Sequence, residues 1–242
     1  MGKKKYSEVK HADKFYEALS AWWLKVEPHA WLIAIAMTGL LLVVAVWLGV
    51  SHYYTARHDR PWVRLFELKE SASARSDEGA EPNAPQALDK LAGLAAEYQG
   101  RPVAAMALLD LTERQFDVAA GQQEDDPKAA AAHFKRAAGA AEQFIADFPD
   151  HPLLGLAEYQ AGKARFALKE YDRAAEHFDK ARAAGIGFLA VLAGWHAGRC
   201  YEHLGRVDEA RRAYEAVRDN RAAGWCGELA ESRLAQLASS AH

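Results

Sequence analysis

Side chains that could do chemistry are scarce in this chain of 242 residues, and hydroxyl nucleophiles are the scarcest. No serine occurs between Asp77 and Glu231, and Thr112 is the only threonine in that stretch. A serine hydrolase needs an activated hydroxyl, and a P-loop needs one to hold Mg²⁺. The sequence therefore argues against both classes of enzyme, and we expect no catalytic residue.

The histidines do not form a recognisable metal-binding pattern. His196 and His203 lie seven residues apart and would share one face of a helix, while His52 and His58 flank a pair of tyrosines. Neither pair has further ligands at a spacing that would complete a metal site. The haem-attachment motif Cys-x-x-Cys-His is also absent. We therefore expect neither a metal nor another cofactor.

Cys200 and Cys226 are the only cysteines, too few for a disulfide scaffold or a four-cysteine zinc site. Cys200 falls in a predicted helix, and Cys226 begins the C-terminal segment that should pack beside it. Two alternatives are open. In an oxidising compartment the pair would form a disulfide that staples the C-terminal segment. Otherwise both are small buried side chains, which is a common role of cysteine.

Composition favours helices and argues against nucleic acid as a partner. Hydrophobic residues make up 50% of the chain, and residues 62–242 contain only nine Val, Ile and Thr beside abundant Ala. Such a composition is typical of helices packed on helices. Residues 1–60 carry a net charge of +3 and residues 61–242 a net charge of −6. An acidic body lacks the basic stripe that neutralises phosphates.

A membrane span is predicted at residues 30–50, a run of 21 residues without a charge. As a helix this run would be about 31 Å long, close to the thickness of the hydrocarbon core. Tryptophans and tyrosines flank it on both sides, as they do at membrane interfaces. The apolar run is longer than the core of a signal peptide, and no cleavage site follows it. The sequence therefore predicts an uncleaved anchor.

Basic residues orient the predicted anchor. Six lysines precede the span, and four basic residues follow it within 20 residues. This bias favours an N-terminus in the cytoplasm. Residues 11–26 are expected to form an amphipathic helix, and two roles are open for it. It would either lie on the inner leaflet or simply lead into the span.

Four segments follow from these patterns. Residues 1–29 form a cytoplasmic segment, 30–50 the transmembrane helix, 51–86 a stem and linker, and 87–242 a helical domain with a capping helix at its end. Within the third segment, residues 61–70 are expected to continue as a helical stem. Residues 71–86, rich in small and polar residues and proline, are expected to be a loop.

The helical domain contains a repeat with an offset of 36 residues. Gly162, Ala174, Phe178 and Ala181 recur as Gly198, Ala210, Tyr214 and Val217. A small residue in a first helix lets a second helix approach closely, and the aromatic residue of the second helix fills the gap. A weaker earlier pair is expected at 103–116 and 128–148, separated by a polar insert at 121–127. Further helices are expected at 87–98 and 228–237.

This pattern resembles the tetratricopeptide repeat, a helix-turn-helix unit of about 34 residues. The likeness covers two repeats, at 155–188 and 191–224, with two extra residues at 184–187. The proline that usually closes the repeat is missing from both. The resemblance implies an all-α fold in which a transmembrane helix precedes a tetratricopeptide-like α-solenoid.

The overall layout narrows the resemblance. A short basic N-terminus, one span, a stem and a small repeat domain are similar to the YfgM-type ancillary subunits of the bacterial SecYEG translocon. Residues 87–105, 198–217 and 229–234 carry the likeness. It implies a single-pass protein of the inner membrane, with its repeats outside the cytoplasm. Translocon subunits or periplasmic chaperones would be its partners.

In tetratricopeptide proteins the first helices of successive repeats line a ligand groove. Carried onto this sequence, the groove residues are Tyr159, Lys163, Phe166, Trp195, Arg199 and Glu202. The aromatic residues offer apolar area, and the two cations can meet a carboxylate. The alternative for the aromatic residues is that they pack in the core and do not bind a ligand. No asparagine is available to clamp a C-terminal carboxylate, so an internal segment is expected as the ligand.

The sequence thus predicts a scaffold or adaptor that is anchored in the membrane and binds other proteins, linked to protein export or to chaperones at the translocon. The alternative within this class is an adaptor for another envelope assembly. The competing hypothesis, from a different class of function, is a protein that works in a cofactor-maturation complex. A metal or haem in the purified protein would favour this hypothesis.

Overall fold

The computed structural model describes residues 16–17, 30–73 and 84–239. The predicted amphipathic helix at 11–26, apart from residues 16–17, and the centre of the predicted linker, 74–83, lie outside the described residues. Within the described ranges the chain is helical and contains no strand, which confirms the all-α prediction. The helices are α2 (Ala30–Ser73), α3 (Ala84–Glu97), α4 (Pro102–Gln122), α5 (Pro127–Asp147), α6 (Leu154–Ala167), α7 (Tyr171–Ala183), α8 (Gly187–His203), α9 (Val207–Arg218) and α10 (Trp225–Ser239).

The chain divides into two compact units, Met1–Arg60 and Pro61–His242. In the first unit, every described side chain of α2 between residues 31 and 55 is exposed, including a dense series of Leu, Val and Trp. By length and composition α2 is apolar enough to cross a membrane, a property that a signal sequence near the N-terminus shares. An exposed apolar surface of this kind is typical of a segment that a membrane or another protein covers.

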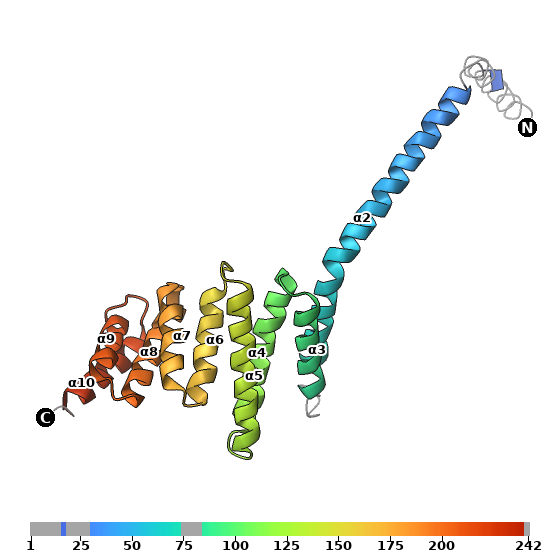
Figure 1. The fold of residues 1–242 in the computed structure, drawn as a ribbon. Coiled ribbons are helices and arrows are strands. Elements are labelled where there is room, and N and C mark those ends of the chain that lie inside the picture. Colours follow the sequence, from blue (N-terminus) through green and yellow to red (C-terminus); the bar gives the residue numbers. More distant parts are fainter. Residues whose placement is uncertain (1–15, 18–29, 74–83, 240–242) are drawn as a thin grey trace, which may run out of the picture. The chain divides into compact units, whose positions relative to one another are not determined.

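In the second unit, helices α3 to α10 follow one another as a stack in which each helix packs on the next (Figure 1). Residues 61–70 are helical, as expected for the stem, and they belong to this unit. Leu65 is buried in one cluster with Leu88 and Leu91 of α3. Lys69 Nζ also lies 3.2 Å from an oxygen of Asp110 in α4. The stem is therefore part of the packed body.

The ends of the predicted loop at 71–86 are helical, which corrects the boundaries expected for it. Helix α2 continues to Ser73, and α3 already begins at Ala84. Small residues at both ends of the segment, mostly Ala and Ser, are compatible with a helix that extends from a packed neighbour.

The core is built from many small side chains and few large ones. Buried alanines line nearly every helix contact, and the largest fully buried side chains are Tyr214, Phe144 and Phe178. Small contact residues allow helix axes to come close, so each aromatic ring fills the gap between two helices. The 36-residue pattern was expected to do this, and the structure confirms it.

Glycine is required at two equivalent contacts between a helix and an aromatic ring of its partner helix. A Cβ atom on Gly162 would lie 2.8 Å from ring atoms of Phe178, and one on Gly198 would lie 2.5 Å from the ring of Tyr214. Real Cβ atoms do not approach other atoms this closely. The predicted equivalence of the two repeats therefore holds at the level of atomic contacts.

The turns inside the two repeats are also equivalent. Gly205 follows α8 with φ of 71°, and Lys169, 36 residues earlier, has φ of 62°. In both turns the next residue donates a backbone hydrogen bond back to the helix, from Arg206 to Tyr201 and from Glu170 to Arg165. Glycine tolerates this left-handed backbone and lysine does so at a cost.

The earlier helix pair forms, as α4 and α5, but α4 continues past the predicted end at 116 to Gln122 and takes in the first residues of the predicted polar insert. Pro102 opens α4, and the polar insert separates the two helices. Asp126 caps α5: its carboxylate accepts hydrogen bonds from the backbone N–H groups of Lys128 and Ala129, at 3.1 and 2.9 Å. Pro127 occupies the first helical position, where its missing N–H costs nothing. Asp126 therefore serves as the N-cap of α5.

Candidate protein-binding groove

The first helices of successive pairs lie next to one another. Besides packing on its own partner, α6 contacts both α4 and α8, and α8 contacts α10. Helices α4, α6, α8 and α10 therefore share one continuous face of the repeat unit. We call this face the first-helix face.

The six predicted groove residues lie on α6 and α8, and all six are half-buried. The structure brings some of them together: the guanidinium carbon of Arg199 lies 4.8 Å from the ring centre of Phe166 on the neighbouring helix. Glu202 is engaged elsewhere, since its carboxylate lies 3.3 Å from the guanidinium of Arg233 in α10. Contacts therefore connect α6, α8 and α10 across this face.

The two cations of the predicted groove are seated on aromatic rings. Lys163 Nζ lies 4.2 Å from the ring centre of Phe116 in α4, and Arg199 sits over Phe166 as described. Among the described residues, no Asp or Glu oxygen comes within 4.0 Å of either cation. A cation over a ring is held in place but keeps its full charge. Both remain available to an anion.

The aromatic residues of the predicted groove also serve the core. Tyr159 packs against the cluster between α7 and α8, and its ring centre lies 5.7 Å from that of Phe178. Burial raises the pKa of its phenol. Trp195 packs against the last cluster, 5.1 Å from Tyr214. Ordinary packing therefore accounts for one side of each ring, and the half-exposed side is left for a ligand.

His196 belongs to this site, although the sequence analysis considered it only as a metal ligand and argued against that role. Its ring lies 5.8 Å from that of Tyr159 and stacks at 5.1 Å on Phe178. Burial, with smaller contributions from Arg199 and Lys163, lowers its pKa to about 4. Its Nδ1 atom is buried without a hydrogen-bond partner. The imidazole is thus neutral at neutral pH. Helix packing places this ring near two cations. The seven-residue spacing between His196 and His203 in the sequence could not indicate this position.

A cavity of about 190 Å³ opens between α4 and α6 on the first-helix face. Its walls combine the rings of Phe116 and Tyr159 with Lys163, and exposed carboxylates of Glu113 and Asp117 also line it. The cavity is large enough to take one side chain of a ligand. Both carboxylates are on α4, so Lys163 has negative charge on that side of the cavity.

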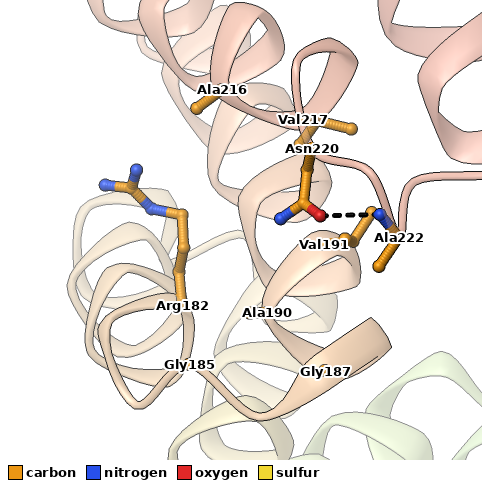
Figure 2. Close-up of a pocket in the computed structure, with 9 residues that line it drawn as sticks. All are labelled: Arg182, Gly185, Gly187, Ala190, Val191, Ala216, Val217, Asn220 and Ala222. Carbon is orange, nitrogen blue, oxygen red and sulfur yellow. Dashed lines mark hydrogen bonds between the residues drawn. The ribbon is translucent and has the colours of Figure 1, made fainter.

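A second cavity, of about 390 Å³, lies outside the predicted groove (Figure 2). It is bounded by the end of α7, the start of α8 and the segment after α9. Arg182 lines it, together with Asn220, whose side-chain oxygen accepts a 2.9 Å hydrogen bond from the backbone N–H of Ala222. Gly185 and Gly187, within the two-residue expansion of the first repeat, form one wall. None of the six predicted groove residues lines this cavity.

Both cysteines are free and buried. Cys200 belongs to the cluster of α7 and α8, and Cys226 to the cluster of α9 and α10. Burial raises the pKa of Cys200 to about 12 and also raises that of Cys226. A thiol that stays protonated is a poor nucleophile and a poor metal ligand. In this structure the two side chains are small core residues, and the disulfide between them in an oxidising compartment stays a prediction.

The other histidines contribute no metal site within the described ranges, which hold no group of three potential metal-ligating side chains. His203, on the face it shares with His196, stacks on Tyr171 with ring centres 4.3 Å apart. His52 is exposed on α2.

Comparison with known proteins agrees with this geometry. A family model for the tetratricopeptide repeat matches residues 192–221, which cover most of α8 and all of α9. None of the curated proteins compared with the chain matches it significantly. Two solved structures of nearly identical tetratricopeptide-like repeats, from a Podosopora anserina protein assigned as a kinesin light chain, match 73% of this chain.

One of these two structures carries a single substitution relative to the other. They share 16% and 17% of residues with this chain, and 87% and 88% of their own lengths are covered; the TM-score is 0.53 for each. At such identity the likeness concerns the fold. Together with the two equivalent glycine–aromatic contacts, it shows that this chain has a tetratricopeptide-like α-solenoid fold, in which residues 192–221 match the tetratricopeptide repeat.

Proposed function

We propose that this protein is a membrane-tethered scaffold that binds a segment of a partner protein on its first-helix face, through Tyr159, Lys163, Phe166, Trp195, Arg199 and Glu202. One observation carries the proposal: two cations without a carboxylate partner sit on aromatic rings on the face that tetratricopeptide repeats generally use for ligands. Such an arrangement offers apolar area and charge together. Because the groove is short, its affinity should be modest, on the order of micromolar.

Substitution of Trp195→Ala together with Arg199→Ala should abolish capture of the partner while the repeats stay folded. Arg199 makes no ion pair that the fold would lose, whereas Trp195 packs on Tyr214, so we expect some loss of stability from the Trp195 change. The measurement is a pull-down of the crosslinked partner combined with thermal melting. Retained binding, or loss of binding only through unfolding, would refute the groove. Arg199→Ala alone separates the two effects.

We further propose that α2 anchors the chain in the bacterial inner membrane, with the N-terminus in the cytoplasm and the repeats outside. The exposed apolar surface of α2 and the bias of basic residues towards its N-terminal side support this orientation. The four-segment organisation, with residues 1–29 inside, 30–50 in the membrane and 51–86 leading to the repeats at 87–242, is part of this proposal.

Protease added to spheroplasts should therefore digest the repeat unit and leave a short fragment embedded in the membrane. The reason is that residues 51–242 would face the enzyme directly. Immunoblotting with antibodies against each end of the chain measures this. If the repeats are protected until the membrane is lysed, the orientation is the reverse of the one proposed.

The resemblance to YfgM-type subunits supports a partner among translocon subunits or periplasmic chaperones, which would give the scaffold a role in protein export. The alternative is an adaptor for another envelope assembly or for a cofactor-maturation complex. Crosslinking in native membranes followed by mass spectrometry distinguishes these partners. Metal or haem analysis of the purified protein tests the maturation alternative separately.

A further inference from the structure

The exposed side of α8 changes in chemistry along its length. Phe188, Leu192, Trp195 and Arg199 follow one another at steps of four, three and four residues, so they form one stripe on the helix. The first three are apolar and the fourth is cationic. The stripe runs from the start of α8, beside α10, to its last turns, beside Phe166 of α6.

The apolar end of this stripe is exposed and is enlarged by α10. Phe188 is 42% exposed, and its ring centre lies 6.2 Å from that of Trp225, which is 59% exposed. Leu229, one turn further along α10, is 42% exposed. We call Phe188, Trp225 and Leu229 the apolar end. Two aromatic rings and a leucine exposed together are typical of a surface that another protein covers.

The cationic end consists of Lys163 and Arg199. They lie on the contacting helices α6 and α8, and Arg199 sits over Phe166, which is three positions from Lys163 on α6. No carboxylate of the described residues lies within 4.0 Å of either cation, so neither is held in an ion pair. A half-buried cation without a partner gains more from an anion than a cation in bulk water does, because the surroundings are less polarisable.

The neighbouring charges select the kind of anion. Glu113 and Asp117 line the same cavity as Lys163, on its α4 side. They would repel a doubly charged phosphate more strongly than a single carboxylate. The described part of the first-helix face also contains no asparagine that could hold a main-chain terminus. A side-chain carboxylate within a segment fits these surroundings.

The two ends have a fixed separation. Phe188 and Arg199 are eleven positions apart on α8, which corresponds to about 16 Å along the helix axis. We propose that the ligand is an acidic amphipathic segment of a partner protein, a proposal that rests on the function proposed above. Its Asp or Glu carboxylate binds between Lys163 and Arg199, and its large apolar side chains cover Phe188, Trp225 and Leu229.

The proposal fixes a spacing in the ligand. The acidic residue and the apolar residues must be about five residues apart in an extended segment, at about 3.3 Å per residue, or about eleven residues apart in a helix. The test is selection of random displayed peptides, long enough to span either distance, on the full chain in detergent micelles. Selected peptides are then synthesised with a fluorophore, and their Kd is measured by anisotropy.

We expect the selected peptides to share an acidic residue at one of these two distances from aromatic or aliphatic residues. Arg199→Gln should raise their Kd roughly tenfold, because a charge-assisted hydrogen bond is lost. Leu229→Ser should weaken binding as well. The matched controls are Lys180→Gln, an exposed cation on α7, and Val207→Ser, an apolar residue that is 41% exposed at the start of α9. Both controls should leave the Kd unchanged.

Other outcomes separate the two proposals. Suppose that the selected peptides contain no acidic residue, that Leu229→Ser weakens their binding and that Arg199→Gln does not. This result would refute the acidic ligand but not the groove. Selection of basic peptides that bind the groove would do the same. If no peptide is enriched, or if binding responds to none of the groove variants, the groove itself is refuted. Arg199→Lys, which keeps the charge, should restore part of the affinity lost in Arg199→Gln.

Discussion

Substitution of Ala230→Glu should detach α10 and lower the thermal midpoint of the repeat unit by roughly 10 °C or more. Ala230 is fully buried in the last cluster, beside Tyr214 and Cys226. A carboxylate placed there would have to be desolvated without a partner, at a cost of several kcal/mol. Detachment of α10 avoids that cost, but it exposes the apolar side of the second repeat, at 191–224. Solenoids are stabilised by contacts between neighbours and need a terminal cap.

The matched control for this prediction is Ala235→Glu, the same substitution at an exposed position of the same helix. It should leave the midpoint unchanged within about 1–2 °C, since surface substitutions cost little. Deletion of Trp225–His242 should reproduce the effect of Ala230→Glu and promote aggregation. An unchanged melt for Ala230→Glu would mean that α10 is not packed as described. Thermal melting followed by circular dichroism of the full chain in detergent measures all three.

Substitution of Gly198→Ala should destabilise the protein by about 1–3 kcal/mol, although alanine is ordinarily the better helix residue. The new Cβ would lie 2.5 Å from the ring of Tyr214, which is fully buried between α8, α9 and α10. The ring has no free space to move into, so the two helices must separate. Gly162→Ala should have a similar effect through Phe178.

The same substitution at another glycine, Gly139→Ala, should change the stability of the protein in the opposite direction. Gly139 lies within α5, and nothing comes within 4 Å of the position of its Cβ. The substitution should therefore stabilise the protein by about 0.5–1 kcal/mol, the ordinary helix preference of alanine over glycine. Chemical denaturation of the three variants measures the signs. Equal effects at Gly198 and Gly139 would contradict the close helix contact.

Helix content and the repeat could be read from the sequence because both depend on local rules. Few β-branched residues and many alanines leave the helix as the favoured element in residues 62–242. The 36-residue offset was visible because the glycine and the aromatic residue must occur at fixed positions for two helices to interlock. The same offset of 36 residues relates Lys169 to Gly205, which adopt the same left-handed backbone conformation in the structure.

The part of the site that sequence reasoning could not supply depends on contacts between helices. The spacing placed Lys163 and Arg199 on the expected face, but it could not show that each cation lies on a ring of the preceding first helix. It also could not show that Glu202 pairs with Arg233 of α10, while its place in the groove stays a prediction. Phe188 and Trp225 lie outside the positions that recur between the two repeats, so no motif singled them out.

The sequence by itself determined that this protein has a helix apolar enough to cross a membrane, an all-α repeat body and few groups capable of chemistry. Each of these follows from composition or from periods of a few residues along the chain. Tertiary structure alone decided which charges stay unpaired, which histidine is buried and neutral, and which aromatic residues are exposed. These properties depend on distances between side chains on different helices, and helix packing sets such distances to within an ångström while the spacing along one helix does not.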